Sequence, residues 1–154
     1  MRNLLLIVVL LFGMSVSAQD VKKLYQEGKA LYEAQQYDKA VPKLKAAAAK
    51  GHKKAQYRLG MCYKEGYGVE KNRKTAIDLF AKSAKQGYGK AQYQLGRAYL
   101  KGKGVAADEV KAKSWLKKAV SDEKEGKEIL DKIRKKAAEG DEDAKTMLRL
   151  LGKK

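Results

Sequence analysis

The most constraining feature of this 154-residue chain is a segment that occurs twice, 36 residues apart. Residues 55–63 read AQYRLGMCY, and residues 91–99 read AQYQLGRAY. The same shift superimposes residues 66–69, GYGV, on residues 102–105, GKGV. Self-similarity at a fixed period of about 20 to 50 residues is typical of solenoids and other repeat proteins. We therefore expect copies of one structural unit rather than a single unrepeated core.

Within one unit, apolar residues recur at every fourth position in two separate segments. The first segment carries Ala55, Leu59 and Tyr63, and the second carries Ala76, Phe80 and Ala84. A spacing of four places these side chains on one face of a helix. Each unit is therefore predicted to be a pair of helices. Because a lone pair cannot bury both faces, neighbouring pairs are expected to stack.

Two glycines and two polar residues indicate how the paired helices meet and begin. Gly60 and Gly96 occupy the same place inside the first helix, where glycine costs up to about 1 kcal/mol relative to alanine. Their recurrence predicts a close approach of the second helix, where a Cβ atom would clash. Asn72 and Asp108 are predicted N-caps of the second helix, because their side chains can accept hydrogen bonds from its free N–H groups.

The pattern divides the body of the chain into three repeats and a weaker end. Gly28 matches Gly60 at a shift of 32, whereas Ala40 matches Ala76 at 36, so the first unit lacks four loop residues. After Ser121 the pattern weakens. We assign a first repeat to residues 21–52, a second to 53–88, a third to 89–121, and degenerate C-terminal capping helices to 122–154.

Residues 1–18 are predicted to be a signal peptide. Arg2 supplies a basic start, residues 4–12 are an unbroken apolar run, and residues 16–18 end in small side chains before a cut at Gln19. An uncleaved anchor helix is the alternative, although the run is short for a bilayer, which needs about 20 residues. We expect an exported bacterial protein, periplasmic or secreted, with no transmembrane segment once the leader is removed.

The motif A-x-x-x-L-G-x-x-Y-x-x-G-x-G-V, followed by N/D-x-x-x-A, resembles the Sel-one-like repeat (SLR) family, a relative of tetratricopeptide repeats. The first unit, with YDKA at residues 37–40, is more similar to a plain tetratricopeptide repeat. The resemblance implies an all-α fold, namely a right-handed α-solenoid of stacked antiparallel helix pairs. It also implies an adaptor or scaffold that binds protein partners.

The resemblance further indicates where a partner would bind. In tetratricopeptide-like solenoids, the side of each first helix that faces away from Leu59 and Tyr63 lines the concave surface. The candidate partner-binding residues on that side are Lys22, Tyr25, Lys29, Lys54, Tyr57, Arg58, Met61, Lys90, Tyr93, Gln94 and Arg97. They include a lysine row and a tyrosine row, which suit a peptide of acidic character. The alternative is that the tyrosines pack between helices and the lysines are solvated surface.

Composition limits the remaining function classes. Lys and Arg number 35 against 18 Asp and Glu, and the net charge of +17 favours an acidic or anionic partner. One Cys and one His cannot form a Cys/His zinc cluster, and neither G-x-S-x-G nor H-E-x-x-H occurs. We predict no catalytic, cofactor-binding or metal-binding residues, no cofactor and no enzymatic activity. The alternative function is binding of anionic envelope polymers or lipid headgroups, and export argues against nucleic acid.

Overall fold

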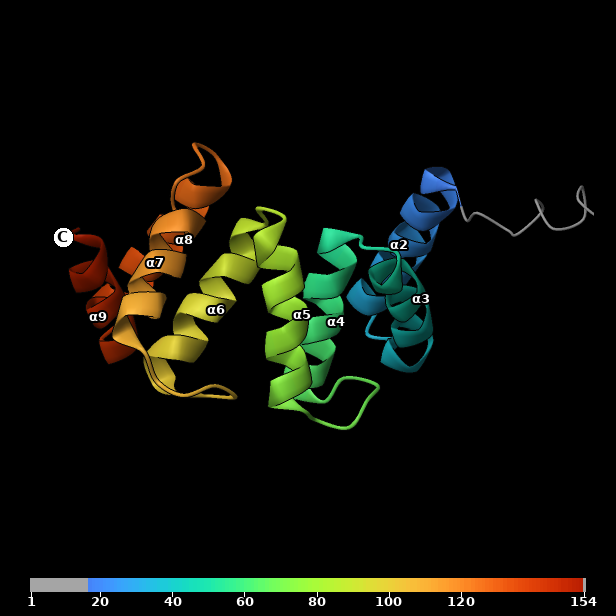
Figure 1. Ribbon diagram of the computed structural model, residues 1–154, viewed down its shortest axis with the longest axis horizontal. Helices are drawn as coiled ribbons and strands as arrows, with labels where there is room; N and C mark the ends of the chain where they lie inside the picture. The colour runs from blue at the N-terminus through green and yellow to red at the C-terminus, as the bar shows by residue number, and fades with distance from the viewer. Residues whose placement is uncertain (1–16, 154) are drawn as a thin grey trace, which may run out of the picture.

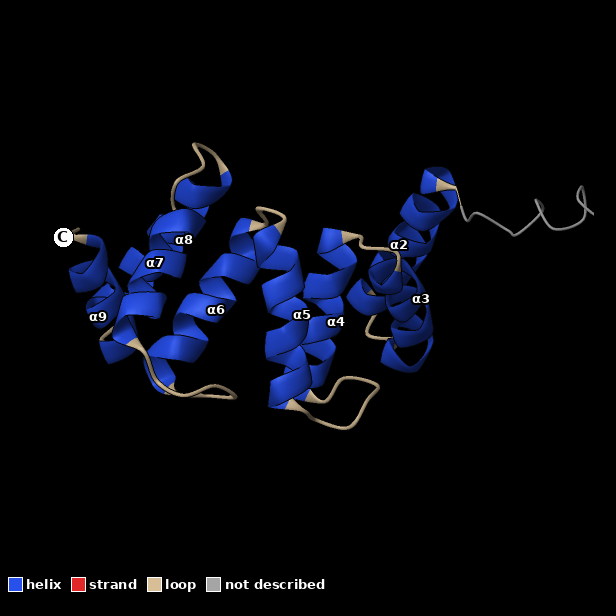
Figure 2. Cartoon of the chain, viewed as in Figure 1, coloured by secondary structure: helices blue, strands red, loops and turns tan. Residues whose placement is uncertain are grey.

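The computed structural model describes residues 17–153, and all regular secondary structure within them is helical (Figures 1 and 2). The helices are α2 (Ala18–Glu33), α3 (Tyr37–Ala49), α4 (Lys53–Glu65), α5 (Arg73–Lys85), α6 (Gly89–Lys101), α7 (Glu109–Ala119), α8 (Glu125–Ala138) and α9 (Glu142–Leu151). They are packed in pairs along one axis of the molecule, with α2 and α3 at one end and α9 at the other (Figure 1). This arrangement confirms the predicted all-α solenoid of packed helix pairs.

The two helices of a pair approach closely at a glycine. A Cβ atom added to Gly60 on α4 would lie 2.6 Å from Cε1 of Phe80 on α5. The corresponding atom on Gly96 of α6 would lie 2.7 Å from Cγ of Leu116 on α7. Side chains do not pack at such distances, so the predicted close approach is confirmed.

The predicted helix caps are also confirmed. The Asn72 side chain accepts a hydrogen bond of 3.0 Å from the backbone N–H of Thr75 at the start of α5. The Asp108 side chain does the same at the start of α7, where the backbone N–H of Lys111 donates at 2.9 Å. Both residues therefore satisfy N–H groups that have no partner within the helix.

Three apolar clusters lie in succession along the solenoid. The first joins α3 to α4, and the second joins α5 to α6. The third joins α7, α8 and α9 around buried Leu116 and includes Tyr93 of α6. Cys62 lies fully buried in the first cluster. Burial raises the pKa of its thiol to about 11, so Cys62 packs as a neutral, apolar residue.

The Gly-x-Gly loops are seated on the helix pair that precedes them. A Cβ atom on Gly68, whose φ is +65°, would lie 2.6 Å from the carbonyl carbon of Tyr37 at the start of α3. A Cβ atom on Gly104 would lie 3.0 Å from the backbone oxygen of Arg73 at the start of α5. Each loop therefore contacts the first turn of the second helix in the preceding pair. No helix pair precedes the first unit among residues 17–153, and its loop is the one that lacks these residues.

Most of the predicted signal peptide, residues 1–16, lies outside the described residues. Ser17 is the N-cap of α2, and its hydroxyl accepts a hydrogen bond of 3.2 Å from the backbone N–H of Asp20. The Asp20 carboxylate in turn accepts from the backbone N–H of Ser17 at 3.0 Å, which completes a capping box. Among residues 17–153, no helix has both the length and the apolar character needed to cross a bilayer.

Candidate functional site

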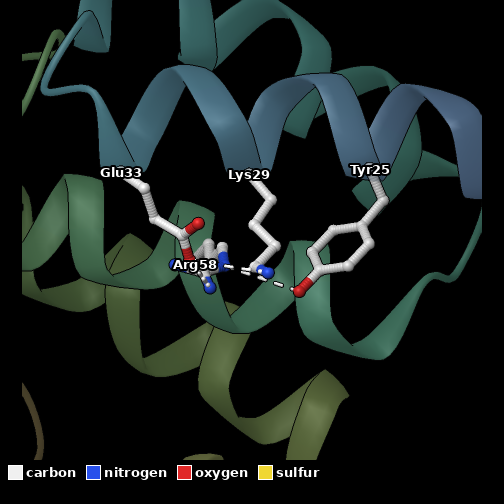
Figure 3. A network of polar contacts seen from close by, with 4 residues as sticks. All are labelled: Tyr25, Lys29, Glu33 and Arg58. Carbon is white, nitrogen blue, oxygen red and sulfur yellow. Dashed lines mark hydrogen bonds and ion pairs between the residues drawn. The ribbon is translucent and has the colours of Figure 1, made fainter.

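Three of the candidate partner-binding residues meet in one polar network between α2 and α4 (Figure 3). Nη2 of Arg58 lies 2.9 Å from Oε1 of Glu33, and Nζ of Lys29 lies 3.7 Å from the same oxygen. Nε of Arg58 donates a long hydrogen bond, 3.5 Å, to the hydroxyl of Tyr25. Figure 3 shows the four side chains converging between the two helices. The network fixes the first helix of the solenoid against the second repeat.

Glu33, which was not predicted from the sequence, supplies the carboxylate that neutralises the cations of this network. Its carboxylate compensates the charges of Arg58 and Lys29, and the Arg58 guanidinium also lies 5.3 Å from the centre of the Tyr32 ring. The Arg58 side chain retains 20% of its exposure. The guanidinium group of Arg58 is therefore engaged in contacts within the protein. The sequence contains a signal for this ion pair, because Lys29 and Glu33 are four residues apart and such residues meet on one face of a helix.

The tyrosines of the row pack at the junctions between repeats, and two of them contact the N-cap residue of the next first helix. The ring of Tyr25 stacks on His52 with centroids 4.2 Å apart, and Tyr57 meets Tyr88 edge-on at 5.2 Å. Tyr93 is 5% exposed and lies within the third apolar cluster. Tyr93 is therefore not accessible to a partner. Its burial agrees with the second alternative of the sequence analysis, in which the tyrosines pack between helices.

Gln94 and Met61 are likewise drawn towards the interior. Gln94 is 9% exposed, and Met61 is half-buried against the cluster of α5 and α6. Burial raises the pKa of Tyr57, and a hydrogen bond with Gln94 and the charges of nearby arginines oppose this shift. Met61, Tyr57 and Gln94 thus contact neighbouring helices, and their role in partner binding stays a prediction.

His52 has a structural role that sequence reasoning did not assign. It is the N-cap of α4, and its Nδ1 accepts a hydrogen bond of 3.2 Å from the backbone N–H of Ala55. Only the neutral imidazole can accept this bond. Burial and the nearby Lys54 both lower the pKa of His52, which keeps the ring in that neutral form.

A hollow of about 590 Å³ lies where α2 faces the start of α4. Three of the candidate residues, Lys22, Tyr25 and Lys54, line it together with His52. Lys22 and Lys54 are exposed, and neither takes part in an ion pair within residues 17–153. The structure therefore brings these two lysines together beside an aromatic wall formed by the stacked Tyr25 and His52 rings.

A second hollow, of about 240 Å³, lies between the second and third repeats. Arg97 and Gln94 line it, and they are the candidate residues that α6 contributes. The other lining residues are Lys64, Glu65, Lys71, Arg73, Ala76, Ile77, Phe80, Ala98, Lys101 and Lys103. The hollow thus has an apolar floor and a basic rim, which we call the basic hollow. Lys90, the remaining candidate, is exposed on α6 and lines neither hollow.

Helix pairs that stack in chain order, with hollows at their junctions, define an α-helical repeat scaffold. The chain contains two Sel1 repeats: residues 53–88 and 89–122 each match the Sel1 repeat. The predicted resemblance to Sel-one-like repeat proteins is therefore confirmed over these residues.

Two solved structures have the same fold. A Sel1 repeat protein from Oxalobacter formigenes is 38% identical over 62% of this chain and 40% of its own length, with a TM-score of 0.60. A protective antigen with an SLR fold, present in uropathogenic Escherichia coli strains, is 33% identical over 68% of this chain and 23% of its own, with a TM-score of 0.63. This chain thus spans less than half the length of either protein. No curated protein matched it.

Proposed function

We propose that this chain is a non-catalytic scaffold that binds a protein or peptide partner through the face formed by α2, α4 and α6. Sel1 repeats generally serve protein–protein interaction. The observation that carries the proposal for this chain is the pair of hollows at successive junctions, which gather Lys22, Tyr25 and Lys54 in one case and Arg97 in the other. Concave sites with a few converging polar groups are typical of binding surfaces.

The charge of this face favours an acidic partner. Lys22, Lys54 and Lys90 are exposed and lack a carboxylate within ion-pair distance among residues 17–153. Lysine and arginine form charge-assisted hydrogen bonds with carboxylates, and such bonds are stronger than neutral ones. The leader inferred for residues 1–18 would place this interaction in the periplasm or outside the cell.

Site-specific photo-crosslinking tests the proposal. A photoreactive amino acid replaces Lys54 or Lys90 on the proposed face, and Val110, which is 80% exposed on α7, serves as the control position. In the native envelope, we expect a discrete crosslinked protein from Lys54 and Lys90 and none from Val110. The same products at all three positions, or none at the two lysines, would contradict a specific partner on this face.

The uncompensated lysines also favour a second candidate function, which is binding of anionic envelope polymers or lipid headgroups. With a net charge of +17, such binding requires only electrostatic attraction. Titration of vesicles containing an anionic lipid, at low and high salt, separates the two candidates. Polymer or headgroup binding falls steeply as salt rises, whereas a complex with buried apolar contacts is much less sensitive.

A further inference from the structure

The basic hollow has a counterpart at the first junction of the solenoid, and that counterpart is filled. Three tyrosines meet there: Tyr37 and Tyr67 stack with centroids 4.5 Å apart, and Tyr32 meets Tyr37 edge-on at 5.3 Å and Tyr67 at 6.3 Å. In the repeat register, the equivalent positions of the second junction are Lys64, Arg73 and Lys103. An aromatic cluster at one junction is thus replaced by three cations at the next.

Two further replacements change the charge of the second junction in the same direction. Met61 at the first junction corresponds to Arg97, and Glu65 corresponds to Lys101. The cation of the first junction, Arg58, is neutralised by Glu33 at 2.9 Å. The repeats therefore share a backbone geometry, but the position filled by tyrosine rings at the first junction is an open space lined by cations at the second.

Most of the cations around the basic hollow have no carboxylate partner. Lys64 pairs with Glu65 at 2.6 Å, and Lys101 pairs with Asp143 of α9. No other ion pair within residues 17–153 involves the rim, so the cations without a partner are Lys71, Arg73, Arg97 and Lys103. Converging like charges repel one another, and an anion placed among them would relieve that repulsion.

Helix α8 adds positive charge from the other side of α6. Burial lowers the pKa of Lys132 on α8, and so do the charges of Lys136, Arg97, Lys90 and Lys64. Lys132 therefore experiences the same field of cations as the hollow. Cations of α4, α6 and α8 therefore lie near enough to act on one another.

The floor of the basic hollow is apolar. Phe80 is 1% exposed, Ile77 is 9% exposed, and Ala76 and Ala98 lie beside them. At about 240 Å³, the hollow is smaller than the roughly 300 Å³ at which sites for whole drug-sized ligands begin. It therefore suits one or two side chains of a larger molecule.

We propose that the basic hollow binds an acidic peptide segment of a partner, in which a carboxylate is held by Arg97, Arg73 and Lys103. An adjacent aliphatic side chain packs on Ile77, the most exposed apolar residue of the floor. Arginine is suited to this role because its planar group bonds a carboxylate through two parallel N–H groups. The inference rests on the proposed function, since it names the chemistry of the partner and the place where it binds.

Fluorescence anisotropy with a short labelled peptide of alternating Glu-Leu pairs and glycines tests this site. Matched probes replace every Glu by Gln, or every Leu by Gly. The test variant, R97M with K103Y, introduces the residues of the first junction. The control variant, K74Y with K113M, removes two exposed lysines outside the hollow and introduces the same side chains. Circular dichroism and thermal melting check that all variants fold.

We expect the Glu-Leu peptide to bind the wild-type chain, and the test variant to weaken that binding about tenfold or more, because charge-assisted bonds are lost. The control variant should bind as the wild type does, and the methyl resonances of Ile77 and Ala98 should shift on titration. Equal affinity for the Gln-Leu or the Glu-Gly probe, equal weakening by both variants, or no binding of the Glu-Leu peptide would overturn the proposal.

The same variants separate this inference from the proposed function. One outcome is that the test variant binds the Glu-Leu peptide as the wild type does and still crosslinks a protein at Lys54. The scaffold function then stands, and the assignment of the peptide site to the basic hollow is wrong. If the peptide binds in the hollow while Lys54 and Lys90 capture no protein, the hollow stands and the wider face fails.

Discussion

The carboxylate of Glu125 accepts a hydrogen bond of 3.2 Å from the backbone N–H of Gly89, 36 residues earlier in the chain. Gly89 is the first residue of α6, and its N-cap residue, Tyr88, makes no side-chain cap bond. A residue of α8 therefore caps a helix of the third repeat. A Cβ atom on Gly89 would lie 2.9 Å from Oε2 of Glu125, so a side chain at that position would displace the carboxylate.

Loss of this cap should destabilise the third repeat. We expect Glu125→Ala to lower the free energy of unfolding by about 1 kcal/mol, because a helix N-terminus loses both a hydrogen-bond acceptor and a favourable charge. Glu128→Ala, on the exposed side of the same helix, is the control and should change it little. Chemical denaturation measures both, and equal effects would show that the cap contributes nothing beyond surface charge.

Alanine at the glycine contacts should be harmful in proportion to the space available. Gly60→Ala would place its Cβ atom 2.6 Å from a ring carbon of Phe80, and overpacking of this kind costs about 1 to 3 kcal/mol. Gly28→Ala is the graded comparison, since its nearest contact, at 3.0 Å, is the flexible end of Leu44. The melting temperature of G60A should be lower than that of G28A. The reverse order would contradict the packing argument, because alanine is otherwise the better helix former.

Stability should decrease in mild acid through His52. Burial and Lys54 lower its pKa from the usual value near 6.5, so the unfolded chain takes up a proton at higher pH than the folded chain. The stabilisation from this cap is fully present above about pH 6.5 and is lost as the pH falls towards the lowered pKa of the folded state. Below that pKa, the contribution of His52 to the free energy of unfolding no longer changes with pH. The charge of Lys53 also lowers the pKa, and no carboxylate lines the hollow beside the ring.

His52→Asn provides the matched control for that pH dependence. Asparagine is a strong N-cap that does not titrate in this range, so the variant should keep the cap and lose the slope. Urea denaturation between pH 7 and pH 5 measures the difference. A slope that is identical in the wild type and in H52N would show that other groups account for it.

The tyrosines of the predicted row should differ in their effect on stability. Tyr93→Ala removes a ring that is 5% exposed, and truncation of a buried aromatic residue costs about 3 to 5 kcal/mol. Tyr25→Ala opens a half-buried position at the edge of the first hollow and should cost less. Calorimetry compares them directly. A Y93A variant that melts as the wild type does would return Tyr93 to the candidate partner-binding surface.

The repeat pattern was sufficient to predict the fold because it depends on contacts inside one helix pair. The spacing of Leu59 and Tyr63, the recurrence of Gly60 and the caps at Asn72 and Asp108 are all local properties of a unit. Local periodicity and capping chemistry can be derived from the residues themselves.

Contacts between units could not be predicted in the same way. The fate of Tyr57 and Tyr93 depends on how far each pair is rotated relative to the next, and no spacing within a unit encodes that rotation. Glu33 and Glu125 act across units, at Arg58 and at the start of α6, and were missed for the same reason. The basic hollow arises between repeats, so its rim combines residues that lie far apart in the sequence.

The backward seating of the Gly-x-Gly loops gives the solenoid a direction of assembly. Gly68 docks on the start of α3 and Gly104 on the start of α5, so each loop needs a surface that precedes it in the chain. A repeat leaving a ribosome therefore meets a docking surface that has already emerged. Growth from the N-terminus can proceed one pair at a time, and no completed unit has to wait for a later one to seat its loop.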